Sequence, residues 1–171
     1  MALVLVVENG SGLTTSNSYA TAAEGDSYHE KHTFASTWTG ASTATKEAAL
    51  CFATRLLDQH VAWYGARCTE TQALRWPRLG LLDQDGYEID SNVVPPAVKN
   101  ATAELARLLI ASDRSADPSA IGIRSVKAGS VAVEFDKSWL PKEIPESAWI
   151  FISHLGARRG AESVAKHLVR A

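Results

Sequence analysis

The stretch Gln72-Ala73-Leu74-Arg75-Trp76-Pro77-Arg78-Leu79-Gly80 joins a large aromatic residue, a proline and two cations in one short segment. Trp76 has a wide ring to bury and an N–H donor to satisfy. Pro77 fixes its own φ and drives Trp76 towards extended backbone, while Arg75 and Arg78 flank the pair. The stretch therefore predicts a rigid aromatic corner, with a helical core built from the chain before and after it. It contains no catalytic signature.

The chain has 171 residues, enough for one domain that buries roughly two thirds of its unfolded surface. Its 17 Lys and Arg residues and 19 Asp and Glu residues leave a net charge of −2. Such a balance gives neither a global basic field for nucleic acid nor the acidic excess of a disordered chain. Partners therefore have to be sought in local patches. We expect residues 1–156 to form the domain and residues 157–171 a C-terminal extension.

Hydrophobic periodicity predicts a mainly α fold, a small helical bundle with a β-hairpin, a short N-terminal strand and a C-terminal docking helix. Thr21 and Glu24 form a capping box at the start of a short helix. Trp38, among Ser, Thr and Gly residues, is expected to anchor a loop on the core. The predicted helices span 22–32, 45–64 and 97–111, with a fourth between Pro145 and Leu155 that stops at Gly156.

Two segments predict β-structure. Residues 3–7 are apolar with little alternation, which is typical of a buried strand with both faces covered. The run is too short for a membrane span and lacks the basic start of a signal peptide. Residues 121–135 alternate on both sides of Ala128-Gly129 and predict a hairpin. Because a lone hairpin is marginally stable, we expect it to pair with residues 3–7 or with another copy of the chain.

Three short patterns suggest ligand sites but have simpler explanations. Residues 8–12 contain two glycines, yet they match neither phosphate-loop spacing, so a turn is expected. His29 and His32 lie three residues apart without further metal ligands nearby in sequence, which favours surface histidines on an exposed helical face. Asp83-Gln84-Asp85-Gly86 begins like a calcium loop, but the glycine comes too early and no glutamate closes it. A turn is the better interpretation there too.

The remaining chemistry is sparse. Cys51 and Cys68 could form one disulfide, but two reduced thiols in an intracellular protein are the expectation. We find no Ser/His/Asp order, paired carboxylates or metal-ligand spacing. The sequence therefore predicts an interaction or assembly protein rather than an enzyme, with no cofactor.

The C-terminal segment 157–171 is amphipathic and basic. Its apolar positions include Val164 and Leu168, and its cations are Arg158, Arg159, Lys166 and Arg170. At this length a helix is marginal alone, so we expect the segment to become ordered on docking against a partner. A frayed, solvated tail is the alternative.

Several of these pieces together resemble a known family. They are Val7-Glu8-Asn9-Gly10-Ser11-Gly12-Leu13, Asn17-Ser18-Tyr19, Glu24-Gly25-Asp26-Ser27-Tyr28-His29, Trp38, the helix from Ala49 to Trp63, Gln72-x-Leu74-x-Trp76-Pro77-Arg78-x-Gly80, Val94-Pro95 and Ala97 to Leu108. This order resembles tailed-bacteriophage proteins described as DnaT-like single-stranded-DNA-binding. The hairpin and the terminal segment are similar to those of phage head-tail connector adaptors. One departure is Gly25, where related chains carry a small helix-former, at a cost of about 1 kcal/mol in helix stability relative to alanine.

The resemblance implies a virion protein of the phage neck, assembled in the host cytoplasm, that forms a dodecameric ring around the exit channel for viral double-stranded DNA. Its partners would be the portal protein, the next neck, stopper or tail-completion protein, and other copies of itself, with no membrane. The portal-binding residues would be Arg158, Arg159, Val164, Lys166, Leu168 and Arg170. The residues that stabilise the fold or a subunit contact would be Gln72, Trp76, Pro77 and Arg78.

The alternative takes the single-stranded-DNA-binding description at face value. That function needs aromatic stacking platforms beside a basic groove. Trp76 with Arg75 and Arg78 offers one such point, and Trp63 and Tyr64 are expected to lie near it. The charged face of the 45–64 helix, which includes Arg55, is expected to be solvated, or to lie at a subunit contact if the protein forms rings.

Overall fold

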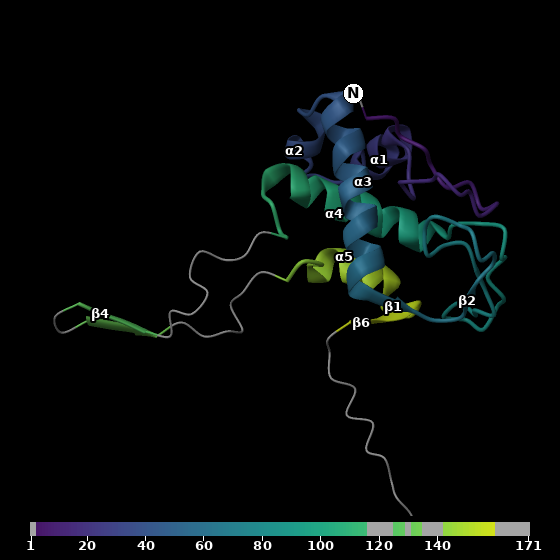
Figure 1. The fold of residues 1–171 in the computed structure, drawn as a ribbon. Helices are drawn as coiled ribbons and strands as arrows, with labels where there is room; N and C mark the ends of the chain where they lie inside the picture. Colours follow the sequence, from purple (N-terminus) through teal and green to yellow (C-terminus); the bar gives the residue numbers. More distant parts are fainter. Residues whose placement is uncertain (1–2, 116–124, 129–130, 135–141, 160–171) are drawn as a thin grey trace, which may run out of the picture.

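The computed structural model describes residues 3–115, 125–128, 131–134 and 142–159 (Figure 1). The helices are α1 Ala22–His29, α2 Ser36–Thr39, α3 Thr43–His60, α4 Pro96–Ala111 and α5 Glu146–Ile152. The strands are β1 Val61–Trp63, β2 Ala66–Arg67, β3 Arg78–Leu79, β4 Ser125–Ala128, β5 Val131–Glu134 and β6 Gly156–Arg158. The predicted mainly helical fold with a β-hairpin is confirmed. None of the described helices combines the length and apolarity needed to cross a membrane.

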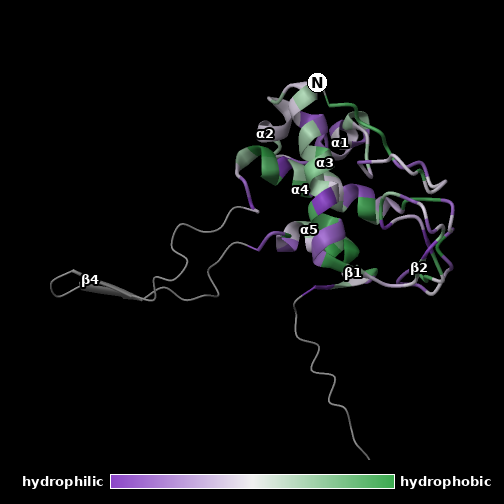
Figure 2. Ribbon diagram, in the orientation of Figure 1, coloured by the Kyte–Doolittle hydropathy of each residue, from purple (hydrophilic) through white to green (hydrophobic). Residues whose placement is uncertain are grey.

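The core lies where α3 crosses α4 and where α4 packs on α5 (Figure 1). Both long helices alternate hydrophobic and hydrophilic positions in Figure 2, as expected for helices with one buried side. The inner faces of α3 and α4 supply four fully buried leucines, which are Leu50, Leu56, Leu57 and Leu105. The helix α5 adds the fully buried Ile152. Each such side chain contributes about 1.5–3 kcal/mol through burial. The predicted 97–111 helix is therefore confirmed, and it begins one residue earlier at Pro96.

The prediction that the second long helix reaches residue 64 is wrong. α3 ends at His60, and Val61–Trp63 form β1, which pairs antiparallel with β6. Val61 and Trp63 are buried while Ala62 between them is exposed, so the apolar spacing at this point has a period of two rather than 3.6. The strand β6 crosses the boundary that the sequence predicts after residue 156. The Arg159 backbone N–H also donates to the His60 carbonyl at 2.8 Å.

The predicted N-terminal strand is also wrong. Val7 makes one isolated parallel bridge with Ser18, and Val4 is 71% exposed. The segment instead bonds to one side chain, that of Asn17, which accepts the Val6 N–H and donates to the Val4 carbonyl, both at 2.8 Å. Directly after it, the buried Glu8 carboxylate accepts the backbone N–H groups of Gly10, Gly12 and Leu13 and the Ser16 hydroxyl, at 2.9–3.0 Å. These bonds curl the chain into a loop, with positive φ at Gly10 and Gly12. The expected turn is confirmed, and its N–H groups serve a carboxylate of the same chain.

The hairpin forms as predicted within its described residues. β4 pairs antiparallel with β5, with Ser125 opposite Glu134 and Ala128 opposite Val131, while residues 121–124, 129–130 and 135 lie outside the described ranges. Among the described strands, β4 and β5 pair only with each other, so the predicted pairing with residues 3–7 is wrong. Pairing with another copy stays a prediction. Where the described chain leaves and re-enters the domain, the Arg114 guanidinium donates to the Lys142 carbonyl at 3.0 and 3.2 Å.

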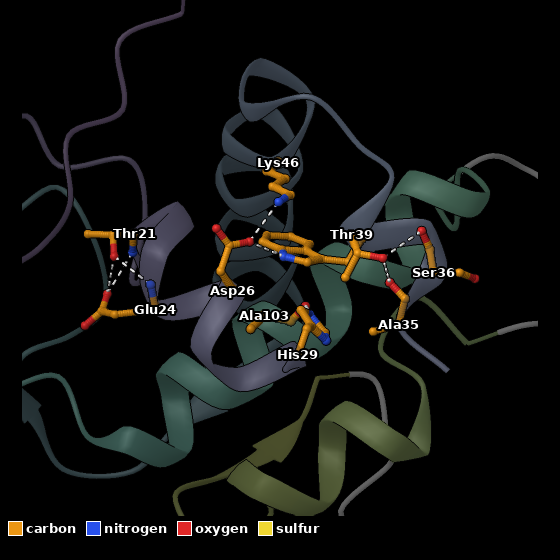
Figure 3. A network of polar contacts seen from close by, with 10 residues as sticks. Thr21, Glu24, Asp26, His29, Ala35, Ser36, Thr39, Lys46 and Ala103 are labelled. Atoms are coloured by element: carbon orange, nitrogen blue, oxygen red, sulfur yellow. Dashed lines mark hydrogen bonds and ion pairs between the residues drawn. The ribbon is translucent and has the colours of Figure 1, made fainter. Parts of the chain in front are cut away.

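The helix α1 is fastened to its neighbours by polar contacts (Figure 3). Its capping box is confirmed: the Glu24 N–H donates to the Thr21 hydroxyl, and the Thr21 N–H donates to the Glu24 carboxylate. Asp26 accepts the Trp38 indole N–H and the Lys46 ammonium, both at 2.8 Å. The Lys46 ammonium is the main cause that holds the pKa of Asp26 below its usual value. α1 ends at His29, three residues before the predicted end.

Gly25 is where α1 makes room for Trp38, whose ring is completely buried. A Cβ atom at residue 25 would lie 2.5 Å from the Trp38 Cζ2 atom. The sequence indicates only a cost in helix stability at this position, whereas the structure shows that a larger residue would displace the ring that anchors α2.

We therefore expect Gly25→Ala to lower the free energy of unfolding by about 1–3 kcal/mol, because overpacking outweighs the better helix propensity of alanine. Urea denaturation monitored by circular dichroism measures the change. The exposed Ser27→Ala in the same helix is the control and should be neutral or slightly stabilising. A gain in stability for Gly25→Ala would contradict the packing argument.

Candidate nucleic-acid interface

An open groove of about 950 Å³ runs along the outer face of α3. α3 contributes residues spaced three or four apart, which places them on one stripe of the helix. The opposite wall comes from the segment just before Trp76 and from the loop before Tyr19. The lining residues are Leu3, Ser16, Asn17, Ala48, Cys51, Phe52, Thr54, Arg55, Asp58, Gln59, Arg67, Ala73, Leu74 and Arg75.

Three exposed arginines meet in this groove, although they come from three different elements. Arg55 lies on α3, Arg67 on β2, and Arg75 in the loop before Trp76. The Arg55 guanidinium lies over the Phe52 ring, 4.7 Å from its centre, which is a cation–π contact. The groove therefore combines local positive charge with an aromatic ring and apolar lining, despite the net negative charge of the chain.

Asp58 is the one acidic side chain among the described residues that line the groove, and its carboxylate is fully engaged. Its Oδ1 accepts the Tyr19 hydroxyl at 2.6 Å and the Trp63 indole N–H at 3.2 Å. Its Oδ2 accepts the Arg75 backbone N–H at 3.0 Å. Burial raises the pKa of Asp58, and burial together with the Asp58 charge raises the pKa of Tyr19 well above its usual value.

The predicted aromatic corner lies inside the domain. Trp76 is completely buried, and its ring meets that of Trp63 edge to face with centres 5.7 Å apart. Gln72 is buried too, and its amide donates to the carbonyls of Leu74 and Pro77 at 2.9 and 3.1 Å. The Trp76–Pro77 peptide bond is cis.

Arg78 is a buried arginine that organises backbone rather than meeting solvent. Its guanidinium donates to the carbonyls of Trp63, Tyr64, Gly65 and Arg75 at 2.5–3.3 Å. Burial lowers the pKa of Arg78, but an arginine remains charged at neutral pH.

The stacking point that the DNA-binding alternative places at Trp76 is therefore wrong. Neither Trp76 nor Trp63 offers a ring face to a base, because both rings are buried. The Arg78 guanidinium already donates its hydrogen bonds to backbone carbonyls. Tyr64 is half-exposed but does not line the groove. Of that predicted group only Arg75 reaches the interface, and its cationic neighbours are Arg55 and Arg67.

The predicted portal-binding residues are only partly described. The Arg158 guanidinium donates to the Ile144 carbonyl at 2.7 Å and to the Glu146 carboxylate at 2.9 Å, and it lies 4.5 Å from the centre of the Trp149 ring. The Arg159 side chain donates to the Val61 carbonyl at 3.1 Å. Val164, Lys166, Leu168 and Arg170 lie outside the described residues.

The structure shows the surroundings of His29 and Asp83, which the sequence patterns suggest as possible metal ligands. His29 is buried, contrary to the predicted exposed face, because its ring packs against Trp38 and its Nε2 lies 3.1 Å from the Ala103 carbonyl (Figure 3). Asp83 caps a turn as expected, accepting the N–H groups of Asp85 and Tyr87 at 2.9 and 2.8 Å. Within the described ranges no three His, Cys, Asp or Glu residues gather as a metal site, and Cys51 and Cys68 are both free thiols.

Sequence reasoning missed the groove itself. Phe52 and Arg55 carry a local signal, since an aromatic residue and a cation three apart share a helix face. No local pattern places Arg67 in the groove, because its position depends on the short β2–β3 ladder, in which it pairs with Arg78.

Comparison with known proteins identifies a family for this chain. Searches of curated proteins and of solved structures found no similar chain. A family model described as "Putative DnaT-like ssDNA binding protein" matches residues 3–164, which span nearly the whole chain. The protein belongs to this family.

Proposed function

We propose that this protein binds single-stranded DNA in the groove along α3. The observation that carries the proposal is the meeting of Arg55, Arg67 and Arg75 in one groove of a chain with no net positive charge. The description of the family supports the same function. Affinity for nucleic acid comes chiefly from neutralised phosphates, and these three guanidinium groups are placed to meet one strand.

The aromatic part of the interface is Phe52 with Arg55 stacked on it. Successive bases in sequence-independent complexes stack on aromatic rings and on guanidinium planes. A base that lies on this pair would leave its phosphates to the other two arginines of the groove, Arg67 and Arg75. The apolar lining residues, such as Leu74, suit bases better than phosphates. The groove thus fits a strand whose bases are unpaired.

The test is a fluorescence-anisotropy titration with a labelled oligothymidylate of about 20 nucleotides, longer than the roughly 4–16 nucleotides that one compact domain covers. We expect a Kd on the order of micromolar at about 50 mM salt. With three phosphate contacts, raising the salt to about 200 mM should weaken binding roughly 20-fold. An equally long abasic strand should bind more weakly, because it offers phosphates without bases.

A matched pair of variants localises the interaction. Arg67→Gln with Arg75→Gln removes two charges from the groove, whereas Lys31→Gln with Lys142→Gln removes two exposed charges outside it. Only the groove variant should lose affinity, by about tenfold or more. No binding by the wild type at low salt, or equal losses in the two variants, would contradict the proposal.

A second candidate is the ring adaptor of a phage neck that the sequence resemblance implies. One observation favours it: β4 and β5 form an antiparallel pair, and a two-stranded hairpin is marginally stable without a further partner, which another copy of the chain could supply. Light scattering of the purified chain, alone and with a portal protein, tests this role. A stable ring that binds portal but not oligonucleotide would replace DNA binding with the adaptor function.

A further inference from the structure

We infer that Asp58 is a positioning residue of the groove, which holds the backbone at Arg75 against α3 so that the Arg75 side chain faces the bound strand. The inference rests on the proposed function and concerns a residue whose charge would otherwise oppose binding. On this inference Asp58 supports DNA binding by holding Arg75 in place, although its own charge repels phosphate.

The geometry that carries the inference is a junction of four segments. Asp58 projects from α3, Tyr19 from the loop before α1, Trp63 from β1, and Arg75 from the loop before the aromatic corner. All three partners donate to the carboxylate. Tyr19 links them further, because its hydroxyl donates to Asp58 while it accepts the N–H groups of Arg75 and Trp76 at 3.1 and 3.2 Å.

The Arg75 N–H is therefore shared between two acceptors, the Asp58 carboxylate and the Tyr19 hydroxyl. Because 56 positions of the chain separate Tyr19 from Arg75, this contact joins segments that the local sequence does not hold together. On its other side the loop is held by Arg78, whose guanidinium donates to the Arg75 carbonyl at 2.9 Å. A carboxylate suits the junction because it accepts from three donors at once without presenting a hydrogen of its own.

Replacement by asparagine separates positioning from charge. Asp58→Asn removes one negative charge from the groove, which by electrostatics alone should strengthen binding to DNA. However, the asparagine side chain has one oxygen and one NH₂ group, and the NH₂ nitrogen cannot accept a hydrogen bond. The NH₂ group must face either the Arg75 N–H or the Tyr19 and Trp63 donors, so at least one of these hydrogen bonds is lost. Positioning therefore predicts weaker binding, opposite in sign to the charge effect.

The experiment measures the Kd of Asp58→Asn for the same oligothymidylate. We expect binding about fivefold weaker than for the wild type, the effect of one lost hydrogen bond. The control Glu30→Gln removes an equal charge at an exposed position outside the groove and should bind as the wild type does or slightly more tightly. Unchanged or tighter binding by Asp58→Asn would overturn the inference.

A second readout needs no DNA. Amide hydrogen exchange at Arg75 and Trp76 should be faster in Asp58→Asn, while the core of α4 keeps its protection. Unchanged exchange at Arg75 and Trp76 in Asp58→Asn overturns the inference. If Asp58→Asn does not fold, Tyr19→Phe isolates the carboxylate, because it removes the acceptor of the Trp76 N–H and leaves the bond from the Arg75 N–H to Asp58. Exchange should then be faster at Trp76 and stay slow at Arg75, and equally fast exchange at both would overturn the inference. If the wild type fails to bind DNA, the proposed function fails, and exchange alone then confirms or overturns the role of Asp58 in holding the loop.

Discussion

Trp76→Ala is expected to lower the free energy of unfolding by about 3–5 kcal/mol, the cost of a large cavity where an aromatic ring was fully buried. For a chain of this length the melting temperature should fall by roughly 6–20 °C. The ring is completely buried and packs on Trp63, so its removal leaves two elements without their common contact. Thermal unfolding followed by circular dichroism measures the effect.

The control for this variant is Tyr87→Ala, because Tyr87 is 73% exposed and should change stability by no more than about 0.5 kcal/mol. Trp76→Phe adds a second comparison. Within the described residues the Trp76 Nε1 atom has no hydrogen-bond partner, so phenylalanine should retain most of the stability that alanine loses. An unchanged melting temperature in Trp76→Ala would show that the corner does not support the core.

Arg78→Met and Arg75→Met are expected to have opposite effects, although the two arginines are only three residues apart. Arg78→Met removes the donors of four carbonyls and should cost about 3 kcal/mol of stability. Arg75→Met changes an exposed side chain and should cost no more than about 0.5 kcal/mol. For DNA binding the order of the two effects reverses, because Arg75 lines the groove and Arg78 does not.

Urea denaturation and the oligothymidylate titration, applied to both variants, measure this separation. Arg75→Met should weaken binding by about threefold to tenfold and lower the salt dependence by roughly one phosphate contact. Arg78→Met, assayed where it is fully folded, keeps the Arg75 side chain and should lose less affinity than Arg75→Met. A destabilised Arg75→Met or a fully stable Arg78→Met would show that the two roles are assigned the wrong way round.

Local signals in the sequence predicted the elements whose partners lie nearby. The capping box at Thr21 and Glu24 needs residues three apart, and the start of α4 follows from Pro95 and Pro96, so neither depends on the rest of the fold. The hairpin ladder is likewise local. The aromatic corner was recognised as structural because tryptophan beside proline restricts the backbone wherever it occurs.

The wrong predictions concern segments whose structure depends on contacts with residues far away in the sequence. Val61–Trp63 leave the helix because β6, nearly a hundred residues later, offers them a ladder, and the spacing of apolar residues does not encode that partner. His29 is buried because Trp38 and Ala103 enclose it. The groove escaped prediction for the same reason, because its arginines come from α3, β2 and a loop. The loop that carries the third arginine is held by the half-buried carboxylate of Asp58.

The contact between Arg114 and the Lys142 carbonyl has a consequence for how this chain can vary. The two points lie next to each other, while α4 and α5, on either side of them in sequence, pack together in the core. The contact therefore holds both attachment points of the span between them at one place on the domain. Closing that span costs an entropy that grows only slowly with its length, so adding residues to it would leave the packing of α4 on α5 as it is.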